Sequence, residues 1–330
     1  MSRPVIEEHQ EIYHYTTAAG LHGIVTSQQL WATHILYLND AEEFIGFFDR
    51  KLPHLLEEPV NRAVAKVYDS SLNRNFINAE GGVNKVTEHL VCDLMSAIRK
   101  TTLSFNQPFV TSFCSAPPGQ TMDDGLLSQW RGYGTDGGYA IVFDTGGLQK
   151  LLDDEFSRFQ YQFGQWGDVY YFDQDENQKA ALPEVREWEE IVEKAVEQFI
   201  LTQKREEFEP LFDAVTALSN MHKHLGFREE SEVRIVALPS NAELLEAAQK
   251  AGDNRPRKLA RFQPRNGILV PYIALFERPA SEPAARLPIT KVIVGPHPER
   301  LKRQKAVELL LEQCEVRAKV VVSDIPYIGR

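Results

Sequence analysis

Two polar side chains lie two positions apart in a strand-like run near the start of the chain. His14 and Thr16 belong to the run Tyr13-His14-Tyr15-Thr16-Thr17, and alternation along a β-strand places both on the same face. An imidazole and a hydroxyl side by side could bind the hydroxyls of a ribose. The alternative is a core histidine that is hydrogen-bonded to the backbone, with Thr16 as an ordinary strand residue.

Three charged residues alternate in a second strand-like run, Glu230-Ser231-Glu232-Val233-Arg234. Alternation predicts that Glu230, Glu232 and Arg234 share one face. A carboxylate beside a sugar could stabilise an oxocarbenium-like centre, and a second carboxylate could position or deprotonate an acceptor. The alternative is a structural ion pair between Glu232 and Arg234 on an edge strand.

The run Gln129-Trp130-Arg131-Gly132-Tyr133-Gly134 combines a guanidinium, a phenol ring and two glycines. Arg131 offers a planar fork suited to a pyrophosphate, and Tyr133 offers a ring for stacking on a base. A strand-like run follows the glycines, so this is not a phosphate-loop fingerprint. We expect Trp130 to pack in the core; the alternative for the whole run is a tight turn.

Asn39-Asp40 and Glu43 form a polar group that ends the second strand-like run. Asp40 as N-cap with Glu43 in the first turn is typical of a helix start. The same polar groups could lie at the rim of a ligand pocket, and the two interpretations are compatible.

In this order, the motifs resemble a bacterial family, the domain of unknown function 2971. A Gly-Pro turn and a terminal Ser-x-Ile-Pro-Tyr complete the pattern, so the resemblance covers nearly the whole chain. Its segments are Tyr13 to Thr16, Asn39 to Glu43, Trp130 to Gly134, Glu230 to Arg234, Gly295-Pro296, and Ser323 to Tyr327.

The start of the chain is also similar to ADP-ribosyltransferase folds, a more distant resemblance. It implies NAD as the substrate, with His14, Thr16 and Asn39 at the ribose and pocket rim. It further implies Arg131 at the pyrophosphate, Tyr133 at the nicotinamide or base, and a catalytic set of Glu232, Glu230 and His14. No metal is expected.

These resemblances predict an NAD-dependent mono-ADP-ribosyltransferase with NAD glycohydrolase activity on the side, in a bacterial toxin or anti-phage defence role. The acceptor is left open between a protein, a nucleic acid and a small molecule. The alternative is a non-catalytic module that senses a nucleotide or a nucleic acid, in which the two acids are structural.

Composition indicates a globular, cytoplasmic protein. The 330 residues include 43% hydrophobic residues, no run of eighteen apolar residues and only three cysteines, so neither a membrane span nor a disulfide framework is expected. The net charge of −11 argues against general nucleic-acid binding. Residues 255–305, however, carry twelve Lys and Arg against three acids. We expect this segment to fold against the acidic remainder; the alternative is a local anion contact for a phosphate-bearing ligand.

The order of the predicted elements indicates an α+β fold. Buried strands are expected near 108–114, 139–144, 232–238, 268–274 and 291–294, and helical patterns occupy about 58–100 and 183–224. No linker is rich enough in Pro, Gly or Ser to divide domains. We therefore expect a single domain over residues 1–330, with a split ADP-ribosyltransferase-like sheet as core and two helical insertions.

Overall fold

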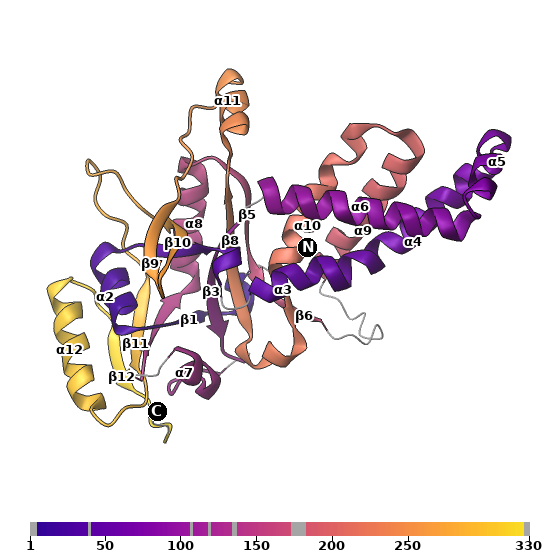
Figure 1. The fold of residues 1–330 in the computed structure, drawn as a ribbon. Helices are drawn as coiled ribbons and strands as arrows, with labels where there is room; N and C mark the ends of the chain where they lie inside the picture. Colours follow the sequence, from indigo (N-terminus) through magenta and orange to yellow (C-terminus); the bar gives the residue numbers. More distant parts are fainter. Residues whose placement is uncertain are drawn as a thin grey trace. The chain divides into compact units, whose positions relative to one another are not determined.

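A computed structural model describes residues 5–38, 41–105, 108–117, 120–133, 137–172 and 183–326. The fold is mixed α and β, as predicted (Figure 1). Backbone contacts divide the chain into two compact units, and each predicted helical insertion falls in the first of them. The prediction of a single domain stays a prediction. The helical unit contains His34–Pro108 and Tyr170–Leu225, and the sheet unit contains Arg3–Thr33, Phe109–Val169 and Gly226–Arg330.

The sheet unit is built around one ten-stranded sheet. Its main path runs through β12 (Lys319–Val322), β11 (Ile289–Val294), β4 (Tyr139–Asp144), β1 (Glu11–Thr16), β3 (Phe109–Ser115), β2 (Leu30–His34), β10 (Ile268–Leu275) and β9 (Arg261–Arg265). Off this path, β8 (Glu232–Pro239) pairs with β3, and β5 (Tyr161–Asp168) pairs with β8. Strands β11 and β12 are parallel.

The sheet divides at β3, because two strands share one of its edges. Strand β8 pairs with β3 from Phe109 to Cys114 and fills one edge. On the other edge, β1 pairs with Cys114 and Ser115 at one end of β3. Strand β2 lies farther along the same edge, where the Thr111 hydroxyl donates to the Trp31 carbonyl at 3.2 Å. Strands β1 and β2 therefore diverge from a common neighbour.

The two faces of the sheet at this junction bury different clusters. Tyr13 is opposite Cys114, and Cys114 is opposite Glu232 on the next strand. Because residues that are opposite in antiparallel strands point to the same side, these three define what we call the Tyr13 face. Ile12, Phe113 and Val233 point to the other side, the Ile12 face, and belong to the largest core cluster.

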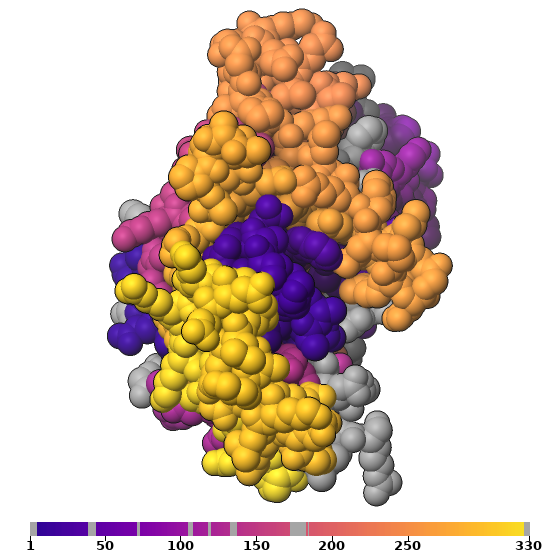
Figure 2. All heavy atoms as spheres, turned by 90° about the vertical axis from the view of Figure 1, so that its left-hand side faces the viewer, coloured from indigo at the N-terminus to yellow at the C-terminus, as the bar shows by residue number. Residues whose placement is uncertain are grey.

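Three helices bury their apolar residues in the cluster of the Ile12 face, and one short helix covers the Tyr13 face. The first three are α2 (Ala18–Ser27), α8 (Thr145–Arg158) and α12 (Arg300–Gln313). Figure 2 shows α12 and the C-terminal segment in yellow beside α2 in indigo, in agreement with the contact between the two helices. The short helix α7 (Leu127–Tyr133) contributes Trp130 to the cluster of the Tyr13 face.

The helical unit is held together mainly by its longest helices. Helix α4 packs against α6 and α9, and α10 packs against α9. Arg62 of α4 forms ion pairs with Glu193 (2.9 Å) and Glu197 (3.2 Å) of α9. The elements are α3 (Ala41–Gly46), a π-helical turn (Phe47–Lys51), α4 (Leu52–Tyr68), α5 (Ser71–Ala79), α6 (Val83–Phe105), β6 (Tyr170–Phe172), α9 (Pro183–Thr202), α10 (Glu209–Met221) and β7 (His222–His224).

The helix predicted to start at about Asp40 begins at Ala41 and belongs to the helical unit, ahead of the insertion predicted from about residue 58. Phe44, Phe47 and Phe48 supply the reason, because all three are buried and thus extend the helical core toward the N-terminus. Among the helices that the structure describes, none combines the length and the apolar character that a membrane crossing requires.

Helix α8 and strand β5 were missed by the sequence patterns. Helix α8 opens with Thr-Gly-Gly, and glycine disfavours helices. Its start is instead fixed by the Asp144 side chain, which accepts a hydrogen bond from the Gly147 N–H at 2.6 Å. Strand β5 is only partly buried along most of its length, so it lacks the alternating pattern of a half-buried strand.

Candidate functional site

The centre of the candidate site is a buried ion pair on the Tyr13 face. Glu232 and Arg234 lie two residues apart on β8, so strand alternation points both side chains to the same side. The Arg234 Nε donates to Glu232 Oε1 at 2.6 Å, and the Arg234 Nη2 donates to Glu232 Oε2 at 3.1 Å. Each side chain is only 3% exposed. This bidentate geometry holds the carboxylate in a fixed orientation.

The prediction that Glu230 shares this strand face is wrong. Strand β8 begins at Glu232, and Glu230 ends a 3₁₀ segment, Leu225–Glu230. Between them, Ser231 has a left-handed backbone with φ of 42°, which breaks the alternation. The Ser115 N–H and hydroxyl both donate to the Ser231 carbonyl at 2.9 Å and hold this bend in place.

His14 and Thr16 lie on the Ile12 face, away from Glu232. The His14 Nδ1–H donates to the Ser112 carbonyl at 2.9 Å, and its ring is 5.6 Å from that of Phe113. This bond bridges β1 and β3 where their backbones part. Burial lowers the pKa of His14, partly offset by the bond to Ser112, so the imidazole is a neutral donor.

Thr16 lies beneath helix α2 and is 9% exposed. A Cβ added at Gly20 of α2 would come within 1.9 Å of the Thr16 hydroxyl oxygen, which shows how closely the helix covers it. The structure therefore does not bring His14 and Thr16 together with Glu232, and their predicted ligand roles stay predictions.

Helix α7 carries the predicted Arg131 and Tyr133 on the Tyr13 face. Trp130 is fully buried, meets the Tyr15 ring edge-on at 4.9 Å and donates its Nε1–H to the Asp124 carbonyl at 2.9 Å, so the prediction that it packs in the core is confirmed. Arg131 is exposed. The Tyr133 side chain lies outside what the structure describes, as do Asn39, Asp40 and the Glu43 side chain. Because Trp130 packs in the cluster of Tyr13 and Cys114, α7 lies on the same face of the sheet as Glu232.

Two tyrosine hydroxyls on the Tyr13 face hold a loop over it, and sequence reasoning missed both. The Met122 N–H donates to the Tyr13 hydroxyl at 3.1 Å, and the Leu126 N–H donates to the Tyr15 hydroxyl at 2.7 Å. Burial raises the pKa of both phenols, so both stay protonated. The available sequence signal was that Tyr13 and Tyr15 flank His14 in the strand, which places both tyrosines together on the face opposite His14.

The C-terminal motif that begins at Ser323 fixes the same loop. The Ser323 hydroxyl donates to the Asp124 carbonyl at 2.7 Å, and the Asp324 N–H donates to the Asp124 carboxylate at 2.7 Å. Since Trp130 also donates to that carbonyl, one residue joins the C-terminal segment to α7.

The basic segment folds against acidic residues, as predicted. Lys258 pairs with Glu155 at 3.0 Å, Arg278 with Asp154 at 2.8 Å and Lys291 with Asp123 at 2.6 Å, and all three acids lie outside the basic segment. A pocket near the end of α12 includes none of the predicted site residues. It is lined by Arg286, Leu311, Glu312, Glu315, Val316 and Arg317.

Comparison with known proteins bears on one segment of this site. Neither a curated protein nor a solved structure matches the chain. Residues 129–235, which run from α7 into β8 and include Arg131, Glu232 and Arg234, match the model of the family described as Protein of unknown function (DUF2971).

Proposed function

We propose that this chain is an NAD-dependent mono-ADP-ribosyltransferase whose site lies on the Tyr13 face. The observation that carries the proposal is the Glu232 carboxylate, 3% exposed and held bidentately by Arg234. It stands at the first position of β8, where β1, β3 and β8 come together. A carboxylate that an arginine holds in a fixed orientation suits the stabilisation of a developing cation.

The proposed reaction breaks the bond between the ribose C1′ and the nicotinamide nitrogen, and the bonding electron pair leaves with nicotinamide. Glu232 stabilises the resulting oxocarbenium-like ribose. A nucleophile on the acceptor then forms the new bond to C1′ and releases a proton. Water in that place gives the NAD glycohydrolase side reaction. The acceptor is a protein, a nucleic acid or a small molecule, and a toxin or defence role is proposed by analogy.

Two further roles are proposed for residues of α7. Arg131 of α7 is proposed for the pyrophosphate and Tyr133 for the nicotinamide or base, because α7 covers the face that carries Glu232. His14 becomes a positioning residue that joins β1 to β3 through Ser112. The divergence of β1 and β2 from one edge of β3 supports a split core of the ADP-ribosyltransferase kind.

Labelled NAD, incubated with the purified chain and a cell extract, tests this proposal. We expect label transfer and nicotinamide release from the parent, and loss of both in Glu232→Ala. The matched control is Glu229→Ala, which removes an exposed carboxylate three residues away and should leave both signals intact. Absence of transfer and release in the parent would contradict the proposal.

A second candidate function is a non-catalytic module that senses a nucleotide or a nucleic acid. The pairing of Glu232 with Arg234 also favours it, since a structural ion pair was the alternative for these two residues. Calorimetric titration separates the two functions. Binding of NAD or a nucleotide without nicotinamide release favours the module, whereas release that depends on Glu232 favours the enzyme.

A further inference from the structure

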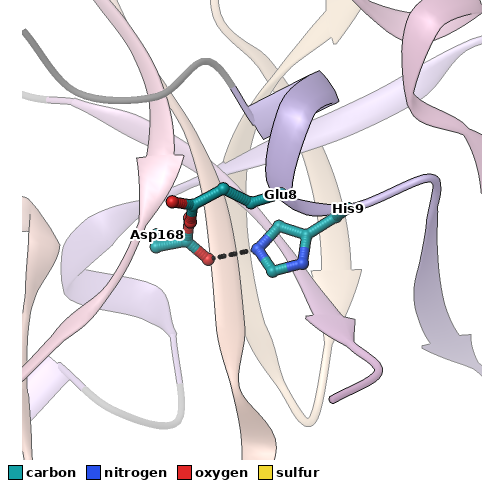
Figure 3. Close-up of side chains that lie close together, drawn as sticks. All are labelled: Glu8, His9 and Asp168. Atoms are coloured by element: carbon teal, nitrogen blue, oxygen red, sulfur yellow. Dashed lines mark hydrogen bonds and ion pairs between the residues drawn. The ribbon is translucent and has the colours of Figure 1, made fainter. Parts of the chain in front are cut away.

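Three potential metal ligands from two distant segments meet near the N-terminus of the sheet unit. Glu8 and His9 are adjacent in sequence, and Asp168 joins them across the fold (Figure 3). One ligand atom from each of the three residues lies within 4.8 Å of the other two. The His9 Nε2 and the Asp168 Oδ1 are 2.7 Å apart.

The backbone around this group is fixed on both sides. The Thr145 hydroxyl donates to the His9 carbonyl at 2.6 Å and to the Gln10 carbonyl at 3.1 Å, which ties the residues after α1 (Val5–Glu8) to the start of α8. Asp168 is the last residue of β5 and is paired with Val233 of β8. The His9 and Asp168 side chains are 11% and 27% exposed, so they are partly shielded from water but reachable.

We propose that Glu8, His9 and Asp168 bind a divalent first-row transition ion. One imidazole and two carboxylates form a donor set that such ions accept while water fills the remaining positions. Ligand atoms about 2.0–2.2 Å from a common ion can be no more than about 4.4 Å apart. Binding an ion therefore requires the 2.7 Å contact between His9 and Asp168 to open and Glu8, whose side chain is exposed and can move, to approach them.

Such an ion would fasten the end of β5 close to the candidate site. The residue after Asp168, Val169, donates its backbone N–H to the Glu232 carbonyl at 2.8 Å. The site itself does not depend on NAD chemistry, so it can be tested apart from the proposed function.

The simpler alternative is an ion pair between His9 and Asp168 with no metal. Glu8 separates the two possibilities, because it is a ligand in the metal site but has no part in the 2.7 Å contact. Glu8→Gln should therefore weaken metal binding while leaving the unfolding temperature of the metal-free protein unchanged.

The experiment is a calorimetric titration of the chelator-treated full chain with Zn²⁺ alone, repeated with Mn²⁺. We expect one site per chain, weakened about tenfold or more by His9→Gln, Asp168→Asn or Glu8→Gln, since loss of a ligand should cost at least as much as loss of an outer partner. His22→Ala, which removes an exposed histidine on α2, is the control and should bind like the parent. Absence of a site, a site that survives His9→Gln, or equal weakening by His22→Ala would overturn the proposal.

Discussion

Two buried ion pairs in the sheet unit differ in how they are assembled. Glu232 and Arg234 are neighbours on one strand and the guanidinium binds both carboxylate oxygens. Glu155 of α8 and Lys258, which precedes β9, are 2% and 4% exposed and come from distant segments. The two pairs are buried to a similar extent, so they must be compared by what lies around them.

The Glu155 carboxylate is surrounded by donors from three further segments of the chain. The Tyr161 hydroxyl donates to Oε1 at 2.6 Å, Lys258 Nζ lies 3.0 Å from the same oxygen, and the Phe276 N–H donates to Oε2 at 2.9 Å. Lys258 also donates to the Ala274 carbonyl at 2.8 Å. Such a network fastens α8 to β5 and β10, and we interpret it as structural.

The comparison teaches that two equally buried ion pairs can differ in what covers them. The Glu155 pair links elements of the core, whereas the Glu232 pair lies on a face covered by a short helix and a hydrogen-bonded loop. Coverings of that kind can move without loss of the sheet.

The largest effect on stability is expected at the structural pair. Lys258→Met leaves the Glu155 carboxylate buried without its cation, which should lower the free energy of unfolding by about 3–5 kcal/mol. Urea denaturation measures it, with Lys250→Met as control because that ion pair is exposed. A loss below about 1 kcal/mol would remove the distinction between the two pairs.

A smaller loss is expected where the loop is held over the Tyr13 face. Tyr15→Phe removes the acceptor of the Leu126 N–H and should cost about 1–3 kcal/mol. Hydrogen exchange should show faster exchange at Leu126, with little change in β4. Unchanged exchange at Leu126 would mean that the hydroxyl does not hold the loop.

The smallest effect is expected from His14, on the opposite face. Because the folded state lowers the pKa of His14, the unfolded chain binds the proton more readily, and stability falls as pH drops below about 6.5. His14→Gln should therefore lose less stability than the parent between pH 7 and pH 5. Denaturation curves at the two pH values measure this, and equal losses in both proteins would contradict it.

The sequence predicted the mixed fold class, most of the central strands and helices within residues 58–100 and 183–224, because these depend on local periodicity. It also identified Trp130 as a core residue. It missed α8, whose opening glycines conceal the helix, and β5, which lacks alternating burial. Local sequence patterns report on only a few residues at a time, whereas α8 and β5 are determined by the segments that pack against them.

The site was harder to predict for the same reason. The pattern around Glu232 gave the Glu232–Arg234 pair, but the bend at Ser231 that removes Glu230 from the strand has no sequence signal. His14 and Glu232 were expected together, yet the register of β1, β3 and β8 sets them on opposite faces. A shift of one residue in register would have reversed that result.

The central claim is that Glu232 is the catalytic carboxylate and Glu155 a structural one. The direct measurement is the rate of nicotinamide release from NAD by the parent, Glu232→Gln and Glu155→Gln, each corrected for its folded fraction. We predict that Glu232→Gln lowers the rate on the order of 100-fold or more, while folded Glu155→Gln keeps a rate close to that of the parent. Equal rates for all three proteins, or a loss confined to Glu155→Gln, would contradict the account.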